Sequence, residues 1–162
     1  MTRLLALDVG EARIGVAVSD PSGFLASPYT TLRVSADELQ TWTAIQRLVD
    51  ETEAESLLIG LPVSLDGQIH AQGERIQAFA ERLRPHIAVP ISFWDERLST
   101  VEARRLLMER GRDEDQRRQR GSRRRRTQTG RRARQGIDAL AATVLLQDYL
   151  DHQRNKTEDT YL

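Results

Sequence analysis

Residues 4–10 of this sequence are Leu-Leu-Ala-Leu-Asp-Val-Gly, and residues 13–18 are Arg-Ile-Gly-Val-Ala-Val. The apolar run around Asp8 predicts a strand that is buried on both faces. Gly10 permits a tight turn, so the second apolar run is expected to return beside the first as a hairpin. A carboxylate in such a strand is costly to desolvate unless it is hydrogen-bonded, ion-paired or bound to a cation. We therefore expect the fold to form around Asp8 and ask which other acids reach it.

The length and composition predict a single domain. A chain of 162 residues is long enough to bury a substantial core. It has no cysteine, which excludes disulfides, thiolate zinc sites and cysteine nucleophiles. The apolar residues before Asp8 are too few for a signal peptide, and no apolar run approaches the length of a membrane span. We therefore expect a cytoplasmic protein without a membrane partner.

The charges are segregated along the chain, although the formal net charge is zero. Residues 110–134 contain twelve arginines and three acidic residues, so the remainder of the chain is acidic. Such asymmetry is typical of an acidic body with a basic arm for a polyanion, and arginine suits bidentate contacts to phosphate. A coding bias towards arginine and a merely solvated segment remain open as alternatives.

Turn and capping signals divide the chain into strands and helices. The sequence Asp20-Pro21-Ser22-Gly23 predicts a turn, and Pro28 predicts an edge position or a bulge in the strand that follows. Ser35, with Glu38 three residues later, predicts a capping box. Strands are expected at residues 3–8, 13–19, 24–34, 56–60 and 87–94, and helices at about 35–52, 72–84, 99–110 and 135–149. The apolar face of the first helix is expected to contain Leu39, Trp42, Ile45, Leu48 and Val49.

This order of strands and helices predicts an α/β protein. Three consecutive strands followed by strands separated by helices are typical of the ribonuclease H-like fold, a mixed five-stranded sheet flanked by helices. We expect residues 1–150 to form this domain, with a flexible Arg-rich insertion at about 111–135. Residues 151–162 are expected to be a polar tail.

Three acids interrupt apolar patterns at distant points of the chain: Asp8, Glu96 and Asp138. Glu96 lies at the end of a strand expected to be parallel to the first, where α/β sheets place their sites. Carboxylates brought together repel one another unless a cation joins them, and Mg²⁺ or Mn²⁺ prefers such oxygen ligands. Two of these ions about 4 Å apart can activate a water and stabilise the leaving oxygen of a phosphodiester. The pattern therefore predicts a metal-dependent nuclease.

Each acid also has a simpler structural interpretation. Asp8 could cap the hairpin turn, and Glu96 could pair with Arg97. Asp138 could be an acid favoured by the dipole near a helix N-terminus. Asp95 competes with Glu96, although on a continuing strand its side chain would point to the opposite face.

Four motifs also carry a family resemblance: residues 7–10 with 13–20, Gly60-Leu61-Pro62, residues 95–103 (Asp-Glu-Arg-Leu-Ser-Thr-Val-Glu-Ala), and residues 138–142 with 145–147. Their residues and order resemble the YqgF family, whose members are named as pre-16S rRNA nucleases and as Holliday-junction-resolvase-like proteins. The resemblance implies a ribonuclease H-like fold, a cytoplasmic location and a metal-dependent nuclease acting on precursor rRNA, with branched DNA as the other substrate. It places the acidic set on Asp8, Glu96 and Asp138.

The sequence departs from the family pattern before the last helix. The link at residues 111–135 is longer and richer in arginine than is usual, and Gly136 stands where a bulkier residue is common. We expect Asp8, Glu96 and Asp138 to be catalytic and to hold two Mg²⁺ or Mn²⁺ ions. The residues expected to bind nucleic acid are Arg13, Arg97, Arg123, Arg124, Arg125 and Arg126.

Other function classes share part of these features. A resolvase of four-way DNA junctions would use the same chemistry but needs a dimer for paired cuts, so both a monomer and a homodimer are open. A non-catalytic RNA-binding module would keep the basic arm and tolerate loss of the acids. An actin-like phosphotransferase is disfavoured, because that class needs two copies of the fold.

Overall fold

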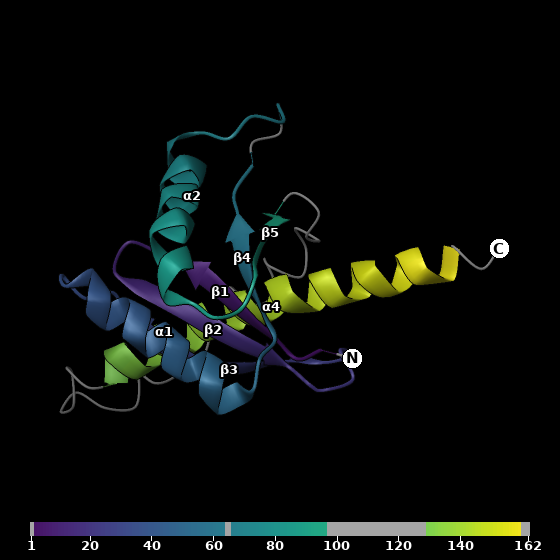
Figure 1. The fold of residues 1–162 in the computed structure, drawn as a ribbon, viewed down its shortest axis with the longest axis horizontal. Helices are drawn as coiled ribbons and strands as arrows, with labels where there is room; N and C mark the ends of the chain where they lie inside the picture. Colours follow the sequence, from purple (N-terminus) through teal and green to yellow (C-terminus); the bar gives the residue numbers. More distant parts are fainter. Residues whose placement is uncertain (1, 64–65, 97–128, 160–162) are drawn as a thin grey trace, which may run out of the picture.

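The central strand of the fold is the apolar run that contains Asp8. The computed structural model describes residues 2–63, 66–96 and 129–159, and within them the sheet has five strands in the order β3-β2-β1-β4-β5 (Figure 1). These strands are β1 (Leu4–Val9), β2 (Arg13–Ser19), β3 (Ala26–Arg33), β4 (Ser56–Leu61) and β5 (Ile91–Asp95). The pairs β1–β2 and β2–β3 are antiparallel, whereas β1–β4 and β4–β5 are parallel.

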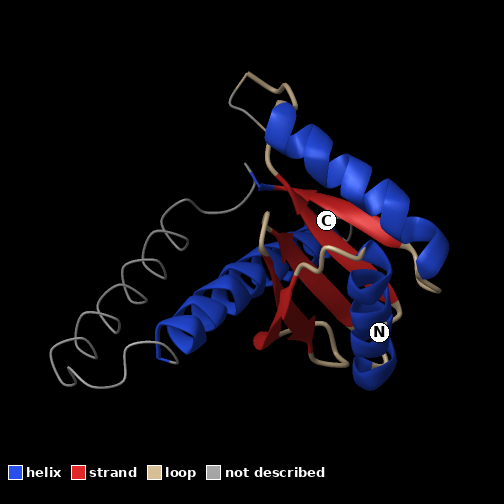
Figure 2. Cartoon of the chain, turned by 90° about the vertical axis from the view of Figure 1, so that its left-hand side faces the viewer, coloured by secondary structure: helices blue, strands red, loops and turns tan. Residues whose placement is uncertain are grey.

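Helices cover both faces of the sheet. α1 (Glu38–Thr52) and α2 (Ala71–Leu83), which leads into the 3₁₀ turn η1 (Arg84–His86), lie on one face. α4 (Thr129–Asp159) crosses the other face (Figures 1 and 2). This arrangement confirms the predicted α/β class, and the order of strands and helices is that of the ribonuclease H-like fold.

The alternation of side chains along the strands separates two apolar cores. On β1, Leu5, Leu7 and Val9 pack with α1 and α2, whereas Leu4 and Ala6 pack with α4. The core beneath α4 contains several alanines, which allow the helix to approach the sheet closely. By the same alternation, position 8 of β1 belongs to the α4 face.

The turn between β2 and β3 forms as predicted, and a single carboxylate orders it. Oδ1 of Asp20 accepts hydrogen bonds from the backbone N–H groups of Phe24 and Leu25, each at 2.8 Å. Its Oδ2 accepts one from the Ser22 hydroxyl, and Gly23 adopts a positive φ of 69°. These hydrogen bonds, that of Ser22 above all, lower the pKa of Asp20 to about 2. Phe24 and Leu25 therefore belong to the turn rather than to the predicted strand.

The pairing of β3 with β2 is interrupted at Pro28. Val16 pairs with Thr30 and Ala17 with Pro28, so Tyr29 is bulged out of the register. Proline has no N–H to donate to a neighbouring strand, which confines it to edges and bulges. The prediction for Pro28 is confirmed, because β3 is an outer strand of the described sheet.

α1 begins at a different cap from the predicted one. Asp37, rather than Ser35, is the N-cap, and its Oδ1 accepts a hydrogen bond from Leu39 N at 3.1 Å. The Ser35 hydroxyl oxygen accepts from Asp37 N at 3.2 Å instead, which orders the residues before the helix. The predicted apolar face is buried at Trp42, Ile45, Leu48 and Val49. Leu39 lies in the first turn and is 58% exposed, so that part of the prediction is wrong.

α4 is longer than the predicted helix at 135–149. Residues 129–134 are helical as well, and they are rich in the good helix formers Arg and Ala; the flexible insertion at about 111–135 stays a prediction. Residues 150–159 continue the helix because no Pro or Gly interrupts them, and Asp151 pairs with Arg154 within one turn. The predicted polar tail begins inside this helix, and the division into a domain and a tail stays a prediction.

The predicted helix at 99–110 and the Arg-rich residues 111–128 lie outside the described residues. Among the helices that the structure does describe, none is long and apolar enough to cross a membrane.

Candidate functional site

Asp8 lies on the face of β1 that is covered by α4. Its neighbour two residues earlier, Ala6, packs in the core beneath α4, and side chains two apart on a strand point to the same side. Asp8 is half-buried and pairs directly with Gly15 of β2. The side-chain direction at Gly15 is therefore the same as that of Asp8.

Gly15 is the point at which α4 rests on the sheet. A Cβ atom at this position would lie 1.9 Å from the backbone oxygen of Asp138 and 2.4 Å from its carbonyl carbon. Only glycine permits so close an approach between a strand and a helix backbone. The contact places Asp138 over the sheet beside Asp8, although 130 positions separate the two in sequence.

Glu96 approaches the same region from the other side of β1. Trp94 packs beneath α4 and pairs with Gly60, so a Cβ at Gly60 would point to that face, and it would meet Glu96, the residue that follows β5. Its Oε1 lies 2.9 Å from the position that a Cβ at Gly60 would occupy. Gly60 follows Ile59, the β4 partner of Leu7, so Gly60 is level with Asp8. Two glycines thus flank Asp8, and each faces one of the other two acids.

Asp95 is directed to the opposite face of the sheet. It pairs with Leu61, which is buried with α1 and α2. Of the two neighbouring acids, only Glu96 shares a face with Asp8 and Asp138.

An arginine occupies the edge of this acidic site. Nε of Arg13 donates to Oδ2 of Asp138 at 2.7 Å, and the two side chains are 37% and 26% exposed. Arg13, which we predicted to contact phosphate, is therefore bound to one of the predicted metal ligands. Within residues 2–63, 66–96 and 129–159, no three acidic or histidine side chains are grouped closely enough to hold a metal ion as they stand.

The other arginines predicted to bind nucleic acid, Arg97 and Arg123 to Arg126, lie outside the described residues. Sequence reasoning assigned no role to Gly15, Gly60 or Arg33. A glycine within an apolar strand is a signal for close backbone approach, and that signal was present at Gly15 and Gly60. Arg33, which pairs with Arg13, had no comparable signal.

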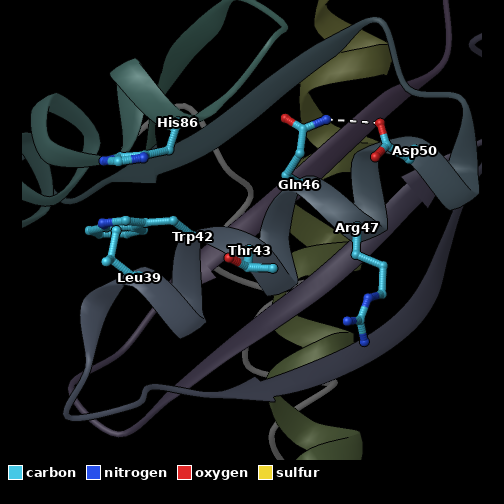
Figure 3. Close-up of a pocket in the computed structure, with 7 residues that line it drawn as sticks. All are labelled: Leu39, Trp42, Thr43, Gln46, Arg47, Asp50 and His86. Carbon is cyan, nitrogen blue, oxygen red and sulfur yellow. Dashed lines mark hydrogen bonds between the residues drawn. The ribbon is translucent and has the colours of Figure 1, made fainter.

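A pocket on α1 lies away from the acids. Its lining residues are Leu39, Trp42, Thr43, Gln46, Arg47, Asp50 and His86 (Figure 3). The rings of Trp42 and His86 stack with centroids 6.3 Å apart, and Gln46 Nε2 donates to Asp50 Oδ1 at 2.8 Å. Trp42 is buried with the α1 and α2 core, so this pocket lies between α1 and η1 on the face of the sheet opposite α4. It does not contribute to the acidic site.

Comparisons with known proteins agree over nearly the whole chain. The family model RuvX, described as Holliday junction resolvase, matches residues 2–152. A protein of Roseiflexus sp. (strain RS-1), named "Putative pre-16S rRNA nuclease", is 42% identical over 155 residues, which cover 94% of this chain and 96% of that protein. A protein of the same name from Thermoanaerobacter pseudethanolicus is 38% identical, with 95% and 99% covered. The Thermus thermophilus RuvC structure overlaps 59% of this chain and 65% of its own, with 9% identity and a TM-score of 0.42.

Proposed function

We propose that this chain, which belongs to the RuvX family, is a metal-dependent nuclease that hydrolyses phosphodiester bonds of precursor 16S rRNA. The observation that carries the proposal is the placement of Asp8, Glu96 and Asp138 on one face of the sheet, around two glycines. The names of the relatives, similar over more than nine-tenths of this chain, support the choice of RNA as substrate. A cytoplasmic location follows as an expectation from that substrate.

The acids fit a hard divalent cation by their chemistry. All three offer carboxylate oxygens, which Mg²⁺ and Mn²⁺ prefer, and they come from three separate parts of the fold: the central strand, the residue after β5, and α4. Bound at these oxygens, two such ions would supply an activated water and stabilise the leaving oxygen. Oδ2 of Asp138 is engaged by Arg13, so a cation at Asp138 would compete with Arg13 for that oxygen.

The chain's own residues have distinct roles in this proposal. Asp8 is the central ligand, since β1 is fixed by neighbours on both sides. Glu96 and Asp138 complete the acidic set from opposite sides of β1. Arg13 positions a substrate phosphate beside the acids, and the arginines at 123–126 hold the nucleic-acid backbone through charge.

The first test is cleavage of a precursor 16S rRNA fragment with Mg²⁺ or Mn²⁺. We expect Asp8→Asn, Glu96→Gln and Asp138→Asn each to lower the cleavage rate by more than about 100-fold. Asp95→Asn is the matched control, because Asp95 neighbours Glu96 but faces the other core, and it should retain most of the activity. Full activity of Asp8→Asn would refute the proposal.

The second candidate function is resolution of four-way DNA junctions, which the description of the matching family model favours. It predicts faster cleavage of a junction than of precursor rRNA in direct competition. It also predicts a dimer, because paired cuts need two active sites. Sedimentation of the full chain with and without a junction tests that requirement.

The basic arm has its own test. Replacing Arg123, Arg124, Arg125 and Arg126 with Ala should weaken RNA binding and flatten its salt dependence. An unchanged slope would show that this segment is merely solvated.

A further inference from the structure

Arg13 of β2 and Arg33 of β3 lie directly opposite each other on adjacent strands, next to the acidic site. Ile14 and Leu32, the next pair, pack towards α1 and α2. Both arginines therefore point to the α4 face. Like charges directly opposite on a sheet repel each other and destabilise the pair.

The two arginines differ in their partners. Arg13 is held by Asp138 at 2.7 Å. Arg33 is exposed and forms no ion pair with any residue in the described ranges. Two guanidinium groups on adjacent strands, one of them without an acidic partner in those ranges, are suited to share one anion. Phosphate is the natural ligand, because arginine binds its oxygens with paired N–H groups.

The position of this pair suits a strand of nucleic acid whose reactive bond lies at the acids. Asp8 is level with Gly15 of β2 and, through it, with Thr31 of β3. Arg33 lies two residues further along β3, which is two strands away from β1. With strands about 4.8 Å apart and about 3.4 Å per residue, the Cα atoms of Asp8 and Arg33 are about 12 Å apart. The phosphate that the arginines bind would therefore be a different one from the phosphate cleaved at the acids.

We propose that Arg13 and Arg33 together bind one phosphate of the substrate strand, and that Arg13 exchanges Asp138 for this phosphate when a divalent cation occupies the acids. The exchange would free Oδ2 of Asp138 for the cation and the guanidinium group of Arg13 for the phosphate. The proposal rests on the proposed nuclease function, from which it takes the cation and the substrate.

The phosphate contact is tested by binding of a short single-stranded RNA to the full chain in the presence of Ca²⁺, which takes carboxylate oxygens as ligands, with the recovered RNA checked to be uncut. Arg33→Gln should weaken RNA binding about tenfold. It should also make the negative slope of log K against log salt shallower by about 0.7, the value for one phosphate contact to a single strand. Arg33 is exposed, so the variant should fold. Arg47→Gln, an exposed arginine on α1, is the matched control and should leave the slope unchanged. A slope equal to that of the wild type in Arg33→Gln would overturn the phosphate contact.

The exchange is tested by calorimetric binding of Mn²⁺ alone. Arg13→Gln removes the competitor for Asp138, so the Mn²⁺ affinity should rise about two- to fivefold, the worth of a partly exposed ion pair. R13K retains a charge that can pair with Asp138 and should stay close to the wild type. Arg33→Gln should not change Mn²⁺ affinity. An unchanged or lower affinity in Arg13→Gln would overturn the exchange.

These measurements separate the inference from the proposed function, because neither of them requires cleavage. If the wild-type chain cuts no nucleic acid, the proposed nuclease function is refuted, and the RNA-binding and Mn²⁺-binding measurements still test the phosphate contact and the exchange. A wild-type chain that cuts RNA, combined with unchanged slopes and unchanged Mn²⁺ affinities, refutes only the inference.

Discussion

Replacing Gly15 by Ala tests the contact that positions Asp138. The new Cβ would lie 1.9 Å from the Asp138 carbonyl oxygen, so α4 would have to withdraw by about 1.5 Å to reach ordinary van der Waals contact. Overpacking of this kind costs about 1–3 kcal/mol, which lowers Tm by about 2–12 °C for a domain of this size. The cleavage rate should fall further, by about 100-fold, because an error of about 1 Å in a reacting group has that effect.

Gly136→Ala, a change on α4 itself, provides the matched control. A Cβ at Gly136 would meet nothing within 4 Å, and Ala is favoured over Gly inside a helix by about 1 kcal/mol. We therefore expect the two Gly→Ala changes to move Tm in opposite directions, as measured by thermal unfolding, and only Gly15→Ala to lower cleavage. A Gly15→Ala variant with the stability of the wild type would refute the reasoning, because α4 could not then rest on β2 at this point.

Three further predictions concern stability. Gly60→Ala should destabilise less than Gly15→Ala in denaturant unfolding, because its nearest obstacle is the Leu145 side chain at 2.2 Å, which can move, rather than backbone. Asp37→Ala should cost about 1 kcal/mol in the same assay and Ser35→Ala less, as expected if Asp37 caps α1; the reverse order would restore the predicted cap. The pKa of Asp20, about 2 in the folded chain against 3.8 as its ordinary value, makes its stabilising effect complete above about pH 4 and lost as the pH falls towards 2. An NMR titration of Asp20 with a midpoint near 3.8 would contradict this.

The strands could be predicted because their apolar residues identify them directly. The runs at 4–9, 13–19 and 56–61 are buried almost throughout. Helix ends depend instead on polar atoms that compete for the same N–H groups. Ser35 and Asp37 are two residues apart and can both accept such bonds, so the pattern alone could not choose between them. The helix at residues 151–159 could not be predicted because these residues are polar and lack an apolar face that would mark them as helical.

The acids could be selected because each interrupts an apolar pattern. Their common face depends on the register between strands and on the contact at Gly15, neither of which the sequence contains explicitly. The ion pair of Arg13 with Asp138 joins residues 125 positions apart, and sequence reasoning had linked Arg13 only to phosphate. That these acids hold a cation stays a prediction.

The interruption of β3 also bears on self-association. An outer strand with free N–H and C=O groups is a template on which another chain can extend the sheet. Pro28 removes one donor from this edge, and the bulge at Tyr29 breaks its regular spacing. Growth of the sheet from one molecule into the next is therefore disfavoured at the β3 edge.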